Sequence, residues 1–376
     1  MSVVLRELQL NDFRNHTQFH VTDAQQLILI VGDNATGKTN IIEAIQLVSM
    51  MDSFRNPHWS NLIYQGKEKA CVMAGFCQNE RLLDIQMEVG DGNKTYLLNG
   101  KKKRKNDLIG LNPAVVFIPD DLGLIKNSAE TRRRLIDDIG QQLSSTYKQV
   151  LQDYQKTVKQ RNAILKEHYD AGVITPLLES WNENLITLGA LLFTHRVRLF
   201  KRYQEKIGDY YQRITDKESI ESFYLPSFLK EDEEMSLLEL VDMSKDEVER
   251  RLYAHLLELR EREYLSARTL IGPHRDEVIF LLDGQDSRRF ASQGQQRSIA
   301  LALKLGQLAL IREISGNQPI LLLDDVMSEL DENRRDMLIK TLDGQIQTII
   351  TTTDLSCFTP EIIKGAQIIT LGPEKL

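Results

Sequence analysis

One octapeptide constrains the fold of this chain more than any other feature. It matches G-x-x-x-x-G-K-[ST], the loop that binds nucleotide phosphates, and it reads Gly32-Asp33-Asn34-Ala35-Thr36-Gly37-Lys38-Thr39. An apolar run at 27–31 precedes it and an amphipathic helical pattern at 38–51 follows, which is the strand–loop–helix context that the motif requires. There the loop N–H groups converge on phosphate, Lys38 reaches the β- and γ-phosphates, and the Thr39 hydroxyl can ligate Mg²⁺. The sequence therefore predicts a nucleotide site, in which we include the next residue, Asn40.

Two aspartates end a second apolar run. The residues from Ile320 to Leu323 are all apolar, and Asp324 and Asp325 follow them directly. Ligands of open α/β sheets bind beyond the carboxyl ends of the strands, so we expect both carboxylates beside the phosphate-binding loop. Asp324 would position Mg²⁺ through water, and Asp325 would orient or deprotonate the attacking water. Alone, such a pair is more often a turn or a helix cap, but beside this loop the catalytic interpretation is favoured.

A third segment stands before a helical pattern at 293–312, and it reads Ser292-Gln293-Gly294-Gln295-Gln296-Arg297. Its serine and glycine lie where a helix begins and can offer a hydroxyl and N–H groups to a phosphate. By itself the segment is better explained as a helix cap, with Ser292 and Gln295 at the positions of a capping box. In order with the other two motifs it resembles the LSGGQ signature of ABC-type ATPases. The segment from Ser328 to Asp331 resembles the D-loop of the same proteins.

Four short segments make a narrower resemblance specific. They are Asn11-Asp12-Phe13-Arg14-Asn15, Arg132-Arg133-Arg134, Gly272-Pro273-His274-Arg275-Asp276-Glu277 and the stretch from Ala291 to Arg297. Over essentially its whole length the chain resembles the RecF family of bacterial recombination mediators, whose ATPase head is similar to that of the SMC proteins. The resemblance implies ATP and Mg²⁺ as cofactors. It also implies that Arg14 and Asn15 approach the nucleotide.

The same resemblance implies how such a site would be used. The Ser292 segment and Asp331 would complete the nucleotide site of a second subunit, so that ATP lies between two copies of the chain. Slow, DNA-stimulated hydrolysis would then act as a conformational switch. The implied partners are double-stranded DNA, single-strand/double-strand junctions and the mediators RecO and RecR, with RecA loading at gaps as the outcome.

The chain departs from transporter-type ABC ATPases at three places. Position 325 is Asp where those proteins have Glu, and the shorter acid suits a slow, switch-like ATPase. Thr351-Thr352-Thr353-Asp354 stands where they carry a switch histidine, and no glutamine follows Phe117-Ile118-Pro119. The γ-phosphate sensor and the Mg²⁺-sensing glutamine therefore stay unassigned.

The pattern of elements predicts an α/β protein with an insertion. We expect a discontinuous ABC-type ATPase domain, with a mixed sheet plus an antiparallel section, at 1–127 and 270–376. The insert at 128–269 shows helical spacing and almost no strand signal, which predicts a mainly helical arm. The expected details are an antiparallel section at 69–98 with turn signals at Asp91-Gly92-Asn93 and Asn99-Gly100, helices at 143–169 and 177–214 separated by a breaker at 170–176, and one helix at 237–262.

Charge and composition limit the partners. The chain has 47 Lys and Arg against 54 Asp and Glu, a net charge of −7, which excludes a uniformly basic coat. The local run Lys101-Lys102-Lys103-Arg104-Lys105 can still attract phosphates, and it carries no interleaved aromatic residue for base stacking. It is therefore our candidate contact to duplex DNA, whereas the cations Arg196, Arg198, Lys201 and Arg202 are interpreted as solubilising a helix.

The cysteine count and the apolar runs bear on location. Three cysteines are too few for a disulfide framework, and no apolar run approaches the roughly 18 residues of a membrane span. We therefore expect a cytoplasmic protein that is not inserted in a membrane.

Two questions stay open at this point. The alternative function is the nucleotide-binding subunit of an ABC transporter, although those subunits carry the signature soon after the phosphate-binding loop, without a long helical insert. The segment from Gly272 to Asp276 is explained equally well as a rigid turn and as a hinge near the signature helix.

Overall fold

The computed structural model describes residues 3–55, 58–78, 81–90, 92–167, 171–215, 218–230, 233–341 and 345–372. It contains two compact units, Met1–Gly123 with Arg297–Leu376, and Leu124–Gln296. The domain limits expected from the sequence, 1–127 with 270–376 around an insert at 128–269, stay a prediction. No helix in the described part of the chain is both long and apolar enough to cross a membrane.

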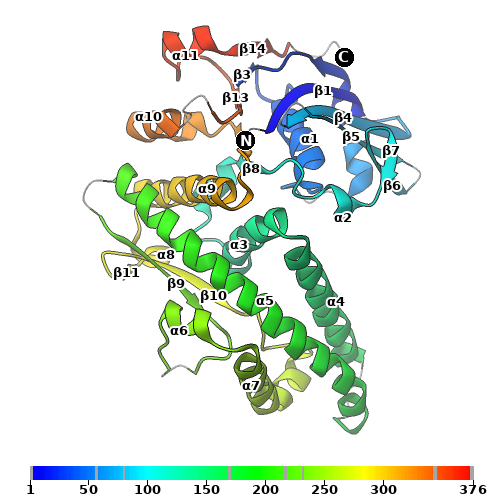
Figure 1. Cartoon of the computed structure of the whole chain (residues 1–376), viewed down its shortest axis with the longest axis vertical. Coiled ribbons are helices and arrows are strands. Elements are labelled where there is room, and N and C mark those ends of the chain that lie inside the picture. The colour runs from blue at the N-terminus through cyan, green and yellow to red at the C-terminus, as the bar shows by residue number, and fades with distance from the viewer. Residues whose placement is uncertain are drawn as a thin grey trace. The chain divides into compact units, whose positions relative to one another are not determined.

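The first unit contains a five-stranded parallel sheet (Figure 1). Its strand order is β14-β3-β13-β12-β8, and every neighbouring pair runs parallel. The strands are β3 (Leu27–Val31), β8 (Ala114–Phe117), β12 (Ile320–Asp324), β13 (Thr348–Thr352) and β14 (Gln367–Thr370). A parallel sheet is covered on both faces, which explains why β3 and β8 are apolar throughout and why β12 is apolar up to its last residue, Asp324.

A six-stranded antiparallel sheet completes this unit, in the order β2-β1-β4-β5-β6-β7. Its strands are β1 (Val3–Phe13), β2 (His16–Val21), β4 (Lys69–Gln78), β5 (Arg81–Gly90), β6 (Asn93–Leu98) and β7 (Lys101–Lys103). The expected antiparallel section is confirmed. Asn99 and Gly100 both have positive φ, 49° and 73°, as a two-residue hairpin turn requires. In the other turn signal, Asp91 lies outside the described residues.

Helix α1 (Lys38–Met50) lies in the core of the first unit. It contacts β8, β12 and β13 of the parallel sheet and β4 and β5 of the antiparallel sheet. Ile41, Ile42, Leu47 and Val48 are at most 1% exposed. Burial of this helix between two sheets fixes the position of the loop that precedes it. The unit also holds α2 (Lys105–Leu108), α10 (Glu332–Thr341), α11 (Pro360–Gly365), the 3₁₀ turns Trp59–Leu62, Pro119–Gly123 and Met327–Glu329, and α9 (Gln293–Ser315) from Arg297 onward.

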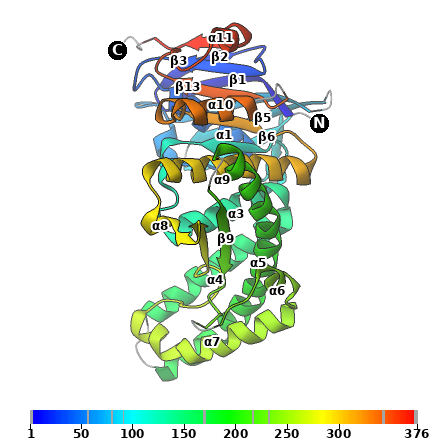
Figure 2. The ribbon, with the colours of Figure 1, turned by 90° about the vertical axis from the view of Figure 1, so that its left-hand side faces the viewer.

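The second unit is mainly helical. Its helices are α3 (Ala129–Leu143), α4 (Ser145–Glu167), α5 (Ala171–Ile214), α6 (Leu237–Asp242), α7 (Lys245–Ser266) and α8 (Ser287–Phe290). Its strands β9 (Ile220–Leu225), β10 (Glu277–Leu282) and β11 (Gln285–Asp286) form an antiparallel sheet in the order β11-β10-β9. Strand β9 contacts the long helix α5, and Figure 2 shows the two elements side by side.

Several expectations for this unit are wrong. Strand β9 is missed by the sequence pattern, because its buried side chains are Ser222 and Tyr224 while Phe223 is 42% exposed. The expected break is wrong from 171 to 176, since α5 begins at Ala171 and contains Pro176; residues 168–170 lie outside the described part. The single helix at 237–262 is two helices, because Ser244 accepts a hydrogen bond from Glu247 N and caps α7.

The segment from Gly272 to Asp276 forms a turn in which Gly272, Pro273 and Asp276 are buried, and its role as a rigid turn or as a hinge stays open. Gly272 has φ of 116°, which favours glycine, and the Asp276 carboxylate accepts hydrogen bonds from Tyr224 Oη and Ser227 N. Burial lowers the pKa of His274 to about 3, so the neutral ring can accept the Tyr154 hydroxyl at Nδ1, 2.7 Å away. The segment therefore joins α4, β9 and β10 through hydrogen bonds.

Candidate nucleotide-binding site

The phosphate-binding loop lies between β3 and α1, and two glycines let it turn. A Cβ atom on Gly37, whose φ is 94°, would lie 2.5 Å from both Asn15 Oδ1 and His16 Nε2. A Cβ atom on Gly32 would lie 2.8 Å from Thr36 Oγ1. Neither distance is possible for a larger residue without rearrangement, so the sequence pattern follows from close packing of the backbone. Between the two glycines, Asp33, Asn34 and Ala35 are exposed.

The start of α1 has the properties of an anion site. Gly37 is its N-cap and makes no side-chain hydrogen bond to the first turn. Asn40 N donates to Gly37 O at 2.9 Å, and the N–H groups before it lie where a helix N-terminus binds anions. Lys38 is 6% exposed, and its ammonium donates hydrogen bonds to Gly32 O at 2.6 Å and to Asp33 O at 2.9 Å. The positive charge thus lies against the loop that would hold the phosphates.

The structure brings the two main sequence motifs into contact. Thr39 Oγ1 donates a hydrogen bond to Asp324 Oδ1 at 3.0 Å, although the residues are 285 positions apart. Asp324 is 5% exposed and is the last residue of β12. Parallel strands end at one edge of the sheet, which explains how the loop after β3 meets a carboxylate at the end of β12.

Thr351 is not among the predicted site residues, yet it organises both aspartates. It is wholly buried at the end of β13, directly opposite Asp324 in the strand register. Its hydroxyl donates to Asp324 Oδ1 at 2.8 Å and accepts from Asp325 N at 2.9 Å. The sequence feature that could have identified Thr351 is its position near the Thr-rich end of a strand. Neighbouring parallel strands end at the same edge of the sheet, so their last residues lie close together.

Asp325 has the environment of a proton acceptor. Its Oδ1 atom is buried and has no hydrogen-bond partner among the described residues, and its φ of 52° is unusual for aspartate. Burial raises the pKa of its carboxyl; the Lys38 charge lowers that pKa and the Asp324 charge raises it. A carboxylate with a raised pKa holds a proton from water more readily, as a general base must.

The oxygen atoms at this edge fit Mg²⁺. Thr39 Oγ1 and Asp324 Oδ1 are adjacent hard donors, and the Oδ1 atom of Asp325 is the buried oxygen without a partner. Within the described ranges no group of three or more His, Cys, Asp or Glu side chains could hold a metal. A small number of oxygen ligands is typical of sites where nucleotide phosphates and water complete the coordination of Mg²⁺.

Asn15 and Arg14 of the N-terminal segment, both expected to reach the nucleotide, have different surroundings. Asn15 Oδ1 accepts a hydrogen bond from Asn40 Nδ2 at 2.6 Å and lies against the loop at Gly37. The Arg14 guanidinium instead donates two hydrogen bonds, of 2.9 Å and 2.7 Å, to the wholly buried carboxylate of Glu43 in α1. A contact between Arg14 and nucleotide stays a prediction.

The signature segment lies at the start of α9. It forms a capping box there, as the simpler interpretation of its sequence predicts. Ser292 N donates to Gln295 Oε1 at 2.7 Å, and Gln295 N donates to Ser292 Oγ at 3.2 Å. Ser292 and Gln293 are exposed, and Gly294 follows them in the first turn. Asp331 likewise caps α10, where its carboxylate accepts from Arg334 N at 3.0 Å. Their roles toward a nucleotide on a second subunit stay predictions.

The run of five cations lies at a sheet edge. Lys101, Lys102 and Lys103 form β7, the last strand of the antiparallel sheet, and all three are exposed. Arg104 follows with 88% of its side chain exposed, and Lys105 is half-buried. Exposed lysines also prevent edge strands from pairing with other chains, so the arrangement has a structural explanation as well as a phosphate-binding one.

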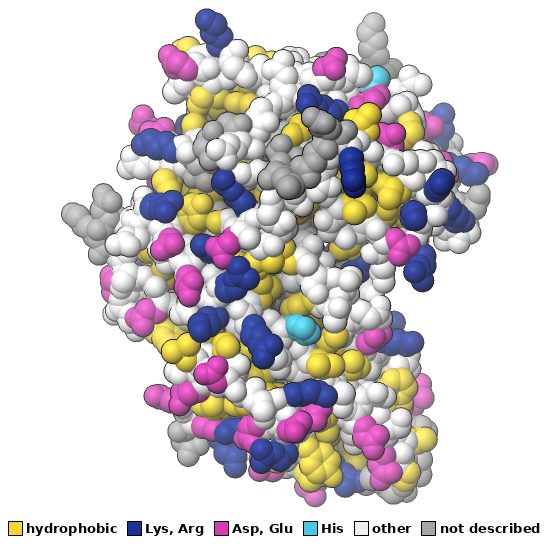
Figure 3. Space-filling model, viewed as in Figure 1, with side chains coloured by type: hydrophobic (Ala, Val, Ile, Leu, Met, Phe, Trp, Pro, Cys, Tyr) yellow, Lys and Arg dark blue, Asp and Glu magenta, His cyan; other side chains and the backbone are white. Residues whose placement is uncertain are grey.

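The cations of α5 have different environments. Arg198 and Arg202 are exposed, and Figure 3 shows dark-blue side chains gathered over this helix. For Arg196 the solubilising interpretation is wrong, because it is 3% exposed and its guanidinium donates to both carboxylate oxygens of Asp137 at 2.8 Å and 2.7 Å.

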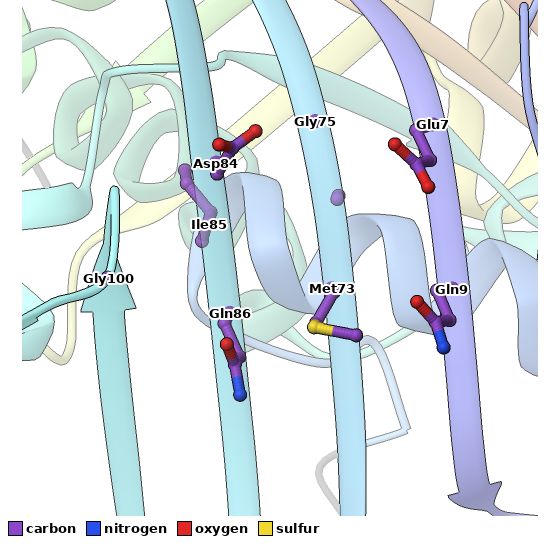
Figure 4. Close-up of a pocket in the computed structure, with 9 residues that line it drawn as sticks. Glu7, Gln9, Met73, Gly75, Asp84, Ile85, Gln86 and Gly100 are labelled. Atoms are coloured by element: carbon purple, nitrogen blue, oxygen red, sulfur yellow. The ribbon is translucent and has the colours of Figure 1, made fainter.

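A hollow lies on the outer face of the antiparallel sheet, away from α1. Its volume is about 350 Å³. Figure 4 shows the carboxylates of Glu7 and Asp84 on either side of Gly75, with Gln9 and Gln86 beside them. These residues alternate along their strands with buried residues that face the core, so the hollow is separate from the nucleotide loop.

Known proteins resemble this chain along nearly its whole length. Residues 4–362 match the family described as RecF/RecN/SMC N terminal domain. DNA replication and repair protein RecF of Thermosynechococcus vestitus is 36% identical over 368 residues, which is 97% of this chain and 94% of that protein. The protein of the same name from Oceanobacillus iheyensis is 33% identical over 369 residues, 97% of both chains.

Solved structures agree with the sequence relatives. A structure of the recombination mediator protein RecF with ATP in the RecFOR pathway covers 95% of this chain and 94% of its own, with 33% identity and a TM-score of 0.83. The corresponding structure named RecF-ATPrS has a TM-score of 0.87 at 32% identity, with the same coverage. An Smc head domain from Pyrococcus furiosus, 18% identical, covers 98% of this chain and 93% of its own and has a TM-score of 0.54, which concerns the fold alone. The predicted ATPase-head fold is confirmed.

Proposed function

The chain belongs to the RecF family, and from that membership and the geometry of its nucleotide site we propose that it is an ATP-dependent DNA-binding protein of DNA replication and recombinational repair. The observation that carries the proposal is the contact between the Thr39 hydroxyl and the Asp324 carboxylate. It joins the phosphate-binding loop to the carboxylate that such sites use for Mg²⁺. Membership in this family favours the DNA-binding hypothesis over the transporter alternative.

The site would bind ATP with Mg²⁺. Its relatives have been solved with ATP, and the loop geometry suits a triphosphate. Lys38 would neutralise the β- and γ-phosphates, while Thr39 and Asp324 would hold Mg²⁺, which supplies further charge neutralisation when bound. Asp325 would accept the proton of the attacking water, which its raised pKa favours. We expect this hydrolysis to be slow and to serve as a conformational switch.

The bound nucleotide would hold two copies of the chain together. Ser292, Gln293 and Gly294 lie at the start of α9, where Ser292 and Gln293 are exposed, and the Ser292 hydroxyl would contact the phosphates in the loop of the second copy. Asp331 would approach the same nucleotide from the D-loop. Hydrolysis would convert the shared ATP to ADP and inorganic phosphate, and the copies would then separate.

DNA would be bound through its phosphates while the dimer persists. The exposed cations from Lys101 to Arg104 support this in a chain whose net charge is −7. By resemblance, the substrates are double-stranded DNA and single-strand/double-strand junctions in the cytoplasm. The partners would be RecO and RecR, since the related structures are assigned to the RecFOR pathway, with RecA loading at gaps as the outcome.

Replacement of Lys38 tests the nucleotide site. Loss of a buried charged partner costs about 2–5 kcal/mol, so Lys38→Ala should weaken ATP binding by roughly thirtyfold or more. The control is Lys67→Ala, which removes a lysine whose side chain is 51% exposed and forms a surface ion pair with Asp12. Equilibrium titration with a fluorescent ATP measures both. Equal affinity of Lys38→Ala and the unchanged protein would remove the assignment.

Sedimentation tests the dimer and its DNA. With ATP, Mg²⁺ and a gapped duplex, the unchanged protein should sediment as a dimer on DNA, and Lys38→Ala should stay monomeric. A monomer of the unchanged protein at saturating ATP and DNA would contradict the proposed switch.

A further inference from the structure

A chain of hydrogen bonds in the second unit ends at the signature serine. Tyr211 Oη donates to Glu218 Oε2 at 2.7 Å, and Gln295 Nε2 donates to Glu218 Oε1 at 2.8 Å. Gln295 Oε1 in turn accepts from Ser292 N at 2.7 Å. Glu218 has no part in the nucleotide site described above, and nothing in the local sequence marks it.

The chemistry of these groups fixes which of them donates and which accepts in each hydrogen bond. A carboxylate can only accept hydrogen bonds, so Glu218 fixes the Gln295 amide with its NH₂ group toward the carboxylate. The amide oxygen must then face the N–H of Ser292, and the opposite orientation would place two donors against each other. Gln295 N donates to Ser292 Oγ, a bond that uses an oxygen lone pair and leaves the hydroxyl proton for another acceptor. The serine is therefore prepared to donate.

Glu218 is itself held from two sides. Tyr211 is wholly buried in α5, and burial raises the pKa of its hydroxyl, which keeps it protonated and able to donate. The next residue, Ser219, donates from N and Oγ to Asp283 Oδ1 at 3.0 Å and 3.1 Å. Asp283 lies in the turn between β10 and β11 and has φ of 46°. The carboxylate therefore has a fixed place between the end of α5 and this turn.

We propose that Glu218 is a positioning residue of the signature segment. Through Gln295, which holds the Ser292 N–H, it aims the exposed Ser292 hydroxyl at a phosphate oxygen of the nucleotide bound by a second copy of the chain. Glu218 is half-buried behind Gln295 and does not touch the nucleotide itself. The inference rests on the proposed ATP-held dimer, and it makes the position of the end of α5 a condition for dimer formation.

Truncation of the carboxylate gives the first test. Glu218→Ala should bind ATP as a monomer with unchanged affinity. Loss of a hydrogen bond to a charged group weakens each composite site about tenfold, and a symmetric dimer contains two such sites, so ATP-dependent dimerisation should weaken about a hundredfold. Glu218→Gln keeps an acceptor oxygen for Gln295 and should recover most of the loss. The matched control is Glu221→Ala, an exposed glutamate on β9.

Mixing variants separates positioning from a general loss of structure. Glu218→Ala has an intact loop, and Lys38→Ala has an intact signature, so an equimolar mixture forms one complete composite site and should recover ATP-dependent dimers and turnover. A mixture of Glu218→Ala with Ser292→Arg contains no intact signature and should recover neither. Equal recovery in both mixtures, or no recovery in either, would overturn the role of Glu218.

The same experiment distinguishes the two proposals. If the unchanged protein stays monomeric with ATP, the ATP-held dimer and the role of Glu218 fail together. If the unchanged protein dimerises and Glu218→Ala dimerises equally well, only the role of Glu218 fails.

Discussion

Replacement of Thr351 by valine tests the organisation of the two aspartates. The wholly buried hydroxyl donates to Asp324 Oδ1 at 2.8 Å and accepts from Asp325 N at 2.9 Å. A hydrogen bond to a charged group contributes about 1.5–3 kcal/mol, and leaving the Asp325 N–H without its acceptor adds about 1 kcal/mol. Valine has nearly the volume of threonine, so the packing term is small. Thr351→Val should therefore lower the free energy of unfolding by about 2.5–4 kcal/mol.

The same substitution should change the Mg²⁺ requirement. Without the Thr351 hydroxyl, Asp324 loses one of the two hydroxyl groups that hold its Oδ1 atom, the other being that of Thr39. The Mg²⁺ concentration for half-maximal ATP binding should rise about tenfold, equivalent to about 1.4 kcal/mol. Urea denaturation and ATP titration at varied Mg²⁺ measure the two effects. Thr351→Ser keeps the hydroxyl and should restore both. The reasoning is refuted if Thr351→Val matches the unchanged protein in Mg²⁺ dependence, or if Thr351→Ser is equally damaged.

Three further substitutions address the catalytic base, the signature and the cations. Asp325→Asn should slow ATP hydrolysis and trap the ATP-bound dimer. The substitution should also raise the melting temperature. Burial raises the pKa of the Asp325 carboxyl, so its ionisation destabilises the folded protein as the pH rises toward neutrality, and asparagine carries no such charge. Unchanged turnover and an unchanged melting temperature would contradict this role of Asp325. In the unchanged protein, turnover should fall on acidification at a higher pH than an ordinary aspartate would give. Ser292→Arg should leave monomer ATP binding intact and abolish dimers, and dimers in sedimentation would count against the shared site. Replacement of all five cations from Lys101 to Lys105 by glutamine should weaken duplex binding and flatten its salt dependence, by a slope of about one for each DNA phosphate that the cations neutralise; an identical slope would reject this surface.

The parts of the fold that could be predicted are those whose pattern is local. Strand β3 and the loop after it follow from an apolar run and two glycines, and strand β12 follows from a second apolar run. A strand buried on both faces is mostly apolar, so its pattern is nearly continuous and easy to detect. These two strands and helix α1 are the elements that position Lys38, Thr39 and Asp324.

The parts that could not be predicted depend on tertiary contacts. Strand β9 buries Ser222 and Tyr224 and exposes Phe223, the reverse of the usual alternation. The Tyr224 hydroxyl donates to Asp276 in the neighbouring turn, and the backbone oxygen of Ser222 accepts from Gln204 in α5. Pro176 suggests a break in α5, but a proline in the early part of a long helix removes one backbone hydrogen bond and the remainder of the helix persists. Glu218 meets Gln295 across 77 positions, and no local spacing encodes that contact.

The distribution of these contacts implies that nucleotide binding and dimer formation are separable properties. Lys38, Thr39, Asp324 and Thr351 are hydrogen-bonded to one another or to the loop within the first unit, so one copy of the chain contains the groups that are proposed to hold MgATP. Ser292 and the residues that orient it belong to the second unit, and their hydrogen bonds run to α5 and to the β10–β11 turn. Substitutions in the first set should therefore lower ATP affinity of the monomer, whereas substitutions in the second set should lower only dimerisation. A variant of the second set that lost monomer ATP binding would show that the two properties are coupled within one chain, and the mixing experiment with Glu218→Ala would then lose its basis.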